Sequence, residues 1–178
     1  MPEIWGRGRE PQAEMDAERL LELVAALERH GARVWLDGGW GVDALLGRQT
    51  RPHDDLDLVV RVEDVAALEA ALAGHGYGRV HGASPQSFEL VDAAGHQVDA
   101  HPVTMRPDGS GVYRLASGGD WLFPPGAFTG RGSVAGRAVP CLVPEVQLRN
   151  HATGYELDAA HRADVAALVE RFGLQPPT

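Results

Sequence analysis

The sequence predicts an α/β fold of the α+β kind, in which a mixed sheet is flanked by helices and followed by a small helical part. In the first half, segments whose apolar residues recur at helical spacing alternate with short apolar runs that are typical of strands. A series of short strands and two more helical segments follow. This order favours a sheet with helices packed on it, because each amphipathic element must bury its apolar side. The 178 residues, 44% of them hydrophobic, suit one domain with an ordinary core.

The first half contains three predicted helices and two predicted strands. Residues 13–30 have apolar side chains at helical spacing, and Gly31 is suited to end that helix. Pro52 excludes regular structure from the loop in the middle of this half. After the first helix we expect a strand at 34–36, a short helix at 40–46, a loop at 48–53, a strand at 56–60 and a helix at 62–75.

The second half is richer in strands and turns. We expect strands at 77–81, 88–92, 96–103, 112–115 and 121–123, a hairpin that joins 133–134 to 138–139, and helices at 144–153 and 158–172. Pro144 suits the first turn of a helix, where its missing N–H is not needed. The expected organisation is a flexible arm at 1–12, a core at 13–142, and a C-terminal helical part of the same domain at 143–174.

Composition limits the class of partner. A formal net charge of −9 and a pI of about 5.3 argue against a nucleic-acid partner, which requires a basic surface, and are compatible with a cationic small substrate. Cys141 is the single cysteine, which excludes an internal disulfide and favours a cytoplasmic location. The polar first twelve residues do not resemble a signal peptide. No apolar run reaches the ~18 residues that a membrane span requires.

Asp55 and Asp57 are the first chemical signal. Side chains at i and i+2 of a strand point to the same face, so these two carboxylates repel each other unless a cation lies between them. Mg²⁺ prefers oxygen ligands, and paired Mg²⁺ ions are widely used for nucleotidyl transfer. We therefore interpret the pair as a site for one or two Mg²⁺ ions. The alternative is a strand end whose acids face water, since an Asp-x-Asp pattern alone is common.

A later strand can complete this site. Asp99 and His101 lie on one face of the predicted strand 96–103, and Val98 and Ala100 lie on the other. If this strand pairs with the one at 56–60, Asp99 becomes a third metal ligand, or a general base that removes a proton from an acceptor hydroxyl. His101 would then contact substrate or phosphate. Its alternative is a solvated surface histidine.

Gly38 and Gly39 follow a strand and open a helix. Glycine lets the backbone approach an oxyanion closely, and a helix N-terminus offers free N–H donors, so a triphosphate would fit there. Arg48, Arg51 and His53 follow in a loop where they can neutralise phosphate charge. The alternative is a tight turn followed by a solvated loop.

This combination resembles the polymerase-β-like nucleotidyltransferase superfamily. Within it, the chain looks like the small antibiotic adenylyltransferases, which are the lincosamide nucleotidyltransferases and the aminoglycoside 2''-adenylyltransferases. The motifs that carry the resemblance are Asp37-Gly38-Gly39-Trp40-Gly41-Val42-Asp43-Ala44-Leu45-Leu46-Gly47, Thr50-Arg51, His53-Asp54-Asp55-Leu56-Asp57 and Val98-Asp99-Ala100-His101-Pro102. It continues through Gly136-Arg137-Ala138-Val139-Pro140-Cys141-Leu142, His151 and Gly154-Tyr155-Glu156.

The resemblance implies a minimal nucleotidyltransferase core and a defined reaction. That reaction is the transfer of AMP from Mg-ATP to a hydroxyl of an antibiotic, with release of pyrophosphate. Asp55 and Asp57 match the family's metal pair, Asp99 matches its third carboxylate, and Gly38 and Gly39 match its triphosphate turn.

The resemblance also extends to the C-terminal part. His151 and Tyr155 match a family motif and would line the nucleotide or acceptor site, with helix packing as the alternative. A homodimer is compatible with so small a core.

Two other functions use the same fold. One is a nucleotidyltransferase that modifies a protein or RNA, as in toxin–antitoxin systems, although the acidic composition counts against RNA. The other is a nucleotide-binding protein without catalysis, which would have no need of Asp55, Asp57 and Asp99.

Overall fold

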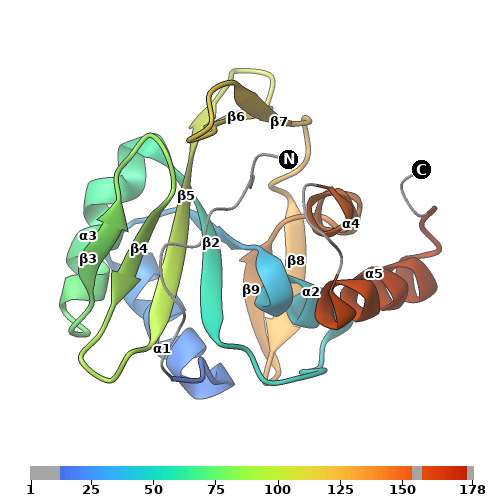
Figure 1. Ribbon diagram of the computed structural model, residues 1–178, viewed down its shortest axis with the longest axis horizontal. Helices are drawn as coiled ribbons and strands as arrows, with labels where there is room; N and C mark the ends of the chain where they lie inside the picture. The colour runs from blue at the N-terminus through green and yellow to red at the C-terminus, as the bar shows by residue number, and fades with distance from the viewer. Residues whose placement is uncertain (1–12, 154–157, 176–178) are drawn as a thin grey trace.

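The computed structural model describes residues 13–153 and 158–175, and it confirms the mixed α/β architecture (Figure 1). The expected arm at 1–12 and the candidate residue Tyr155 lie outside the described residues. The strands are β1 (Val34–Leu36), β2 (Asp55–Arg61), β3 (Gly78–Gly82), β4 (Phe88–Val91), β5 (Gln97–Met105), β6 (Gly111–Arg114), β7 (Asp120–Phe123), β8 (Gly130–Val134) and β9 (Arg137–Cys141).

In the described residues these nine strands form one mixed sheet. Its order is β3–β4–β5–β2–β1–β9–β8, and β6 pairs with both β5 and β7. Strands β2 and β5 are parallel, as are β1 and β9, while β1 and β2 are antiparallel. The pairing of β2 with β5 lies near the middle of the sheet, so both strands have a neighbour on each side.

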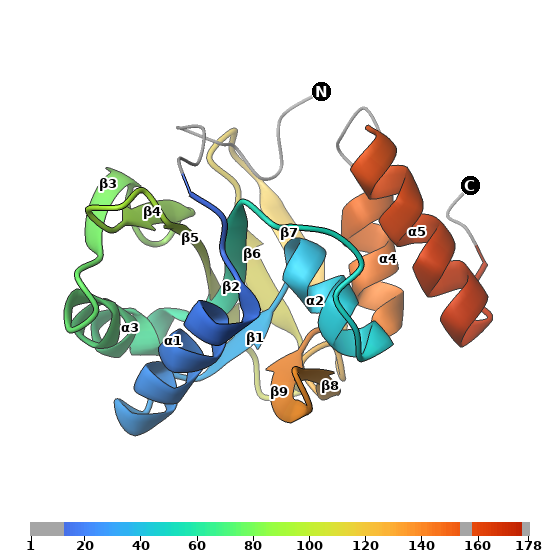
Figure 2. The same ribbon diagram turned by 90° about the horizontal axis from the view of Figure 1, so that it is seen from below.

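Five α-helices surround the sheet in the part of the chain that is described. They are α1 (Ala17–Arg29), α2 (Gly38–Leu46), α3 (Val65–Ala73), α4 (Pro144–Ala152) and α5 (Ala159–Phe172), and a 3₁₀ turn, Val62–Asp64, precedes α3. Figure 2 shows α1 and α3 next to each other, with α2, α4 and α5 gathered at the other end of the molecule. None of these helices is both long and apolar enough to cross a bilayer.

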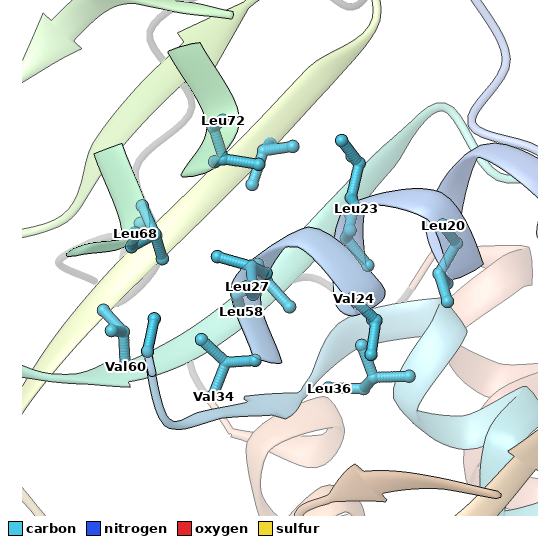
Figure 3. Close-up of a cluster of buried hydrophobic side chains, with 14 of the residues drawn as sticks. Leu20, Leu23, Val24, Leu27, Val34, Leu36, Leu58, Val60, Leu68 and Leu72 are labelled. Atoms are coloured by element: carbon cyan, nitrogen blue, oxygen red, sulfur yellow. The ribbon is translucent and has the colours of Figure 1, made fainter. Parts of the chain in front are cut away.

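The main core lies between the sheet and the helices α1 and α3 (Figure 3). Its labelled side chains come from four elements, and all of them are buried: Leu20, Leu23, Val24 and Leu27 of α1, Val34 and Leu36 of β1, Leu58 and Val60 of β2, and Leu68 and Leu72 of α3. The apolar spacing in α1 and the alternation in β2 therefore point at the same volume, which explains why both patterns are visible in the sequence.

Several element boundaries differ from those expected, and side-chain capping explains the first two. Helix α1 begins at Ala17 because Asp16 accepts a hydrogen bond from the backbone N–H of Arg19 at 2.8 Å. Helix α2 begins at Gly38 because Asp37 accepts from the Gly38 N–H at 2.9 Å, so the glycine pair is the first part of the helix. Strand β3 begins at Gly78, one residue later than expected, and the Tyr77 side chain is buried in the core.

The other face of β2 and β5 is divided along its length. Val59 and Val103 belong to a second apolar cluster, together with Tyr113 and Phe123 of the β6–β7 hairpin and Val146 of α4. On the same face, Asp55 and Asp57 precede Val59 in β2, and Gln97, Asp99 and His101 precede Val103 in β5. This division leaves the beginning of β2 and the first half of β5 available for chemistry.

The first prediction concerns the main core. Replacing Leu58 with Ala should lower the free energy of unfolding by about 3 kcal/mol, because the fully buried side chain leaves a cavity. Leu122 on β7 is 52% exposed, and Leu122→Ala should change that free energy by less than about 0.5 kcal/mol. Urea unfolding followed by circular dichroism measures both. Equal losses would contradict this description of the core.

Candidate active site

The two faces of β2 have opposite characters. Leu56, Leu58 and Val60 point into the main core, while Asp55 and Asp57 point to the other face. Strand β5 lies parallel to β2 with Asp57 directly opposite Asp99. Adjacent strands are about 4.8 Å apart, so the three carboxylates share one face of the sheet. The pairing that the sequence left conditional is confirmed, as is the inward orientation of Val98 and Ala100.

Asp99 occupies an unfavourable place for a negative charge. Its side chain is buried, and the Gln97 side-chain amide donates a hydrogen bond to it at 2.9 Å. Burial, and secondly the charge of Asp57, raise the pKa of Asp99 to about 7. A carboxyl group with this pKa can accept a proton near neutral pH. The carboxylate face is therefore suited both to a cation and to a general base.

His101 partly balances these acids. Its buried Nε2 lies 3.3 Å from Asp57 Oδ1. Burial works to lower the pKa of His101, but the hydrogen bond to Asp57 and the charges of Asp57, Asp37 and Asp99 raise it overall. The imidazolium form is therefore favoured beside the carboxylates. The predicted placement of His101 on the same face as Asp99 is correct.

Two acids at this face were not identified from the sequence. Asp37 caps α2 and also accepts a hydrogen bond from the Asn150 side chain of α4 at 3.2 Å. Burial, and then the charge of Asp57, raise the pKa of Asp37. Glu89 on β4 is buried and lies opposite Asp99 on the side away from β2. The capping position of Asp37 and the alternation Phe88-Glu89-Leu90 were the available signals.

The glycine pair lies directly against the carboxylates. Gly38 has φ +60°, and a Cβ there would overlap the Asp57 carboxylate. A Cβ on Gly39 would overlap the ring of His53 and would lie 2.7 Å from a terminal guanidinium nitrogen of Arg51. Only glycine allows this close approach, which sets the first N–H groups of α2 beside Asp57. This arrangement is compatible with an anion at the start of the helix.

The three basic loop residues separate in space. Arg51 reaches the start of α2 and pairs with Asp164 of α5 at 3.0 Å. His53 is buried against Trp40, and its ring nitrogen is hydrogen-bonded to Asp43. Asp43 therefore orients the loop from within α2.

Arg48 lies at the opposite end of α2. Its backbone N–H donates to the Asp43 carbonyl at 3.2 Å, and the residue lines a small cavity of about 180 Å³ with Gly47 and Ser133. Helix α2 has nine residues and is therefore about 13 Å long, which separates Arg48 from the glycine pair.

His151 of α4 is buried between α4 and α5. Its Nδ1 is 3.7 Å from Asp164 Oδ2, and its ring centroid is 5.6 Å from that of His161. Burial lowers the pKa of His151, although the charges of Asp37 and Asp164 act in the other direction. His151 therefore contacts the C-terminal helix α5 and is influenced by the charge of Asp37.

The carboxylate face has the donor chemistry for Mg²⁺. Across 13–153 and 158–175, no group of three or more His, Cys, Asp or Glu side chains forms a complete metal site. Mg²⁺ is usually held by one or two carboxylates, with substrate phosphates and water supplying the other ligands. Asp55 and Asp57 beside Asp99 fit that requirement, and the raised pKa of Asp99 reflects its burial first and the charge of Asp57 second.

Comparisons with known proteins agree with this geometry. Residues 19–168 match the family described as aminoglycoside-2''-adenylyltransferase. The chain is 32% identical over 152 residues to a lincosamide resistance protein of Staphylococcus haemolyticus, which covers 85% of this chain and 92% of that protein. It is 33% identical over 120 residues to a 2''-aminoglycoside nucleotidyltransferase of Klebsiella pneumoniae, and the match covers 67% of this chain and 63% of that protein.

Solved structures give the same result. A lincomycin-bound lincosamide antibiotic adenylyltransferase superposes with a TM-score of 0.77 at 29% identity, covering 88% of this chain and 98% of that one. A 2''-aminoglycoside adenylyltransferase in complex with adenylyl-2''-tobramycin shares the fold with a TM-score of 0.72 at 24% identity. The match covers 88% of this chain and 89% of that one. The chain therefore belongs to the aminoglycoside-2''-adenylyltransferase family and is a nucleotidyltransferase.

Proposed function

We propose that this enzyme transfers AMP from Mg-ATP to a hydroxyl group of an antibiotic and releases pyrophosphate. The observation that carries the proposal is the register of β2 and β5, which sets Asp57 opposite Asp99 beside the start of α2. One site thus combines carboxylates for a cation, helix N–H groups for phosphate and a candidate base.

The triphosphate binds at the start of α2 in this proposal. Gly38 and Gly39 form the start of this helix, and Arg51 supplies positive charge at the same point. His53 acts indirectly, because it is buried and held by Asp43. Arg48 lies at the far end of α2 and takes no part in this assignment.

Asp55 and Asp57 would hold Mg²⁺, which supplies charge neutralisation at the triphosphate when bound. Asp99 accepts the proton of the acceptor hydroxyl. The hydroxyl oxygen then forms a bond to the α-phosphorus, the bond from that phosphorus to the bridging oxygen breaks, and pyrophosphate leaves. The pKa of Asp99, raised to about 7 by burial and by Asp57, suits this step near neutral pH.

A lincosamide is the first acceptor to test. The lincosamide resistance protein matches over 92% of its own length, whereas the 2''-aminoglycoside nucleotidyltransferase matches over 63%. An aminoglycoside is the second. The net charge of −9 and the buried acids Asp37, Asp99 and Glu89 favour a cationic acceptor of either class.

The second prediction tests the reaction and its metal pair. The wild-type chain, incubated with Mg-ATP and a panel of lincosamides and aminoglycosides, should add one AMP unit to an antibiotic, as detected by mass spectrometry. Asp57→Asn should lower the rate by about a thousandfold, because a carboxylate ligand is lost while the side-chain volume is kept. Asp54→Asn, at an exposed position just before β2, is the matched control and should retain wild-type activity.

The outcomes separate the rival functions. AMP added to a protein or RNA and to no drug would favour a macromolecular acceptor. No AMP transfer to any acceptor would leave a nucleotide-binding protein. Wild-type activity in Asp57→Asn would contradict the assignment of the metal pair.

The third prediction tests the close approach at the start of α2. Gly38→Ala should lower kcat/KM for AMP transfer at least about a hundredfold, because the added Cβ displaces the Asp57 carboxylate. Gly76→Ala is the control, since Gly76 has φ +83° but no atom within 4 Å of the added Cβ. Both variants carry backbone strain, so thermal melts should show similar destabilisation. Equal loss of activity in the two would mean that strain alone explains the effect.

A further inference from the structure

Asp164 is a buried acid that the proposed reaction does not use. It lies on α5, and its side chain is only 3% exposed. Helix α5 is fixed to α2 and α4 by an apolar cluster that includes Val42, Leu148 and Leu168. An acid in such a place is costly unless cationic or hydrogen-bonding groups compensate it. Its partners therefore indicate why it is there.

The main partner of Asp164 is Arg51. A terminal guanidinium nitrogen of Arg51 lies 3.0 Å from Asp164 Oδ2, although the two residues are 113 positions apart in the chain. Arg51 precedes β2, so this ion pair joins the C-terminal helix to the loop before the metal pair. His151 is the second group close to Asp164, with Nδ1 at 3.7 Å.

Arg51 is held in a defined place by this pair. One of its terminal nitrogens lies 2.7 Å from the position that a Cβ on Gly39 would occupy, at the start of α2. Its Nε and both ring nitrogens of His151 are buried, and they have no hydrogen-bond partner among the described residues. The Arg51 guanidinium, with one nitrogen that has no hydrogen-bond partner among the described residues, therefore lies at the start of α2.

We propose that Asp164 is a positioning residue for the nucleotide: it holds the Arg51 guanidinium at the start of α2, where the guanidinium contacts the terminal phosphates. This inference rests on the proposed function, which seats the triphosphate at Gly38 and Gly39. An arginine side chain has many rotamers, and fixing it before the ligand arrives reduces the entropy lost on binding. The C-terminal helical part then contributes to nucleotide affinity through α5.

The test begins with binding, which does not depend on the acceptor. The probe is the α,β-methylene analogue of ATP with Mg²⁺, titrated by calorimetry. Asp164→Asn should raise the Kd about tenfold, because the guanidinium is no longer fixed. Asp164→Glu keeps the charge and should recover part of the affinity. In AMP transfer, Asp164→Asn should raise KM for ATP and change kcat by less than about twofold.

A double-mutant cycle separates positioning from packing. If Asp164 acts through Arg51, Arg51→Gln should weaken binding by itself, and adding Asp164→Asn to it should cause little further loss. The neutral pair in the double variant also avoids a lone buried charge. Asp158→Ala is the matched control on the same helix, because it removes the N-cap hydrogen bond to the His161 N–H without touching Arg51. It should lower Tm and leave the Kd unchanged.

Each result decides the inference. The inference is overturned, while the proposed function stands, by any of three results. The Kd is unchanged in Asp164→Asn, the losses of affinity multiply in the double variant, or Asp158→Ala weakens nucleotide binding as much as Asp164→Asn does. A wild-type chain that neither binds the analogue nor transfers AMP would overturn the proposed function, and this inference with it. The inference is supported if Asp164→Asn weakens nucleotide binding, if this loss is non-additive with that of Arg51→Gln, and if Asp158→Ala causes no such loss.

Discussion

The parallel pairing of β2 with β5 is the constraint on which the site depends. It sets Asp57 opposite Asp99 although the two residues are far apart in the chain. The alternation of side chains then sends Leu56 and Leu58 into the core and the carboxylates to the other face. A shift of one residue would bury acids in the core and expose the leucines of β2, or Val98 and Ala100 of β5. The apolar core therefore fixes the register, and the register fixes the site.

The cost of this arrangement is electrostatic. Asp37, Asp57, Asp99 and Glu89 gather where three of them are buried, and burial raises the pKa of Asp37 and Asp99. His101 offsets part of the repulsion through its hydrogen bond to Asp57. Packed apolar residues would be more stable at these positions, so the cluster is more economically explained by chemistry than by stability.

The end of the chain is joined to this site by polar contacts. Asn150 donates to Asp37, and the Gln147 side-chain amide donates to the Leu36 carbonyl at 3.1 Å. Asp164 pairs with Arg51. These contacts link α4 and α5 to the turn after β1 and to the loop before β2, which are the two segments that flank the glycine pair and the Asp55–Asp57 pair. The helical part is therefore connected to the start of α2 and to the loop before β2.

The sequence alone was sufficient for much of the fold and for the central acids. Helical spacing predicted α1, alternation predicted β2 and β5, and the Asp-x-Asp pattern with the glycine pair indicated nucleotide chemistry, because these signals arise from neighbours along the chain. It missed Asp37 and Glu89, since their importance comes from partners on other elements. It also grouped Arg48 with Arg51, although α2 separates them. Local periodicity thus determined the elements and the Asp55–Asp57 pair. Only the tertiary structure decided which charges meet, because the sheet register sets Asp57 opposite Asp99, and the docking of α4 and α5 brings together residues that are 113 positions apart.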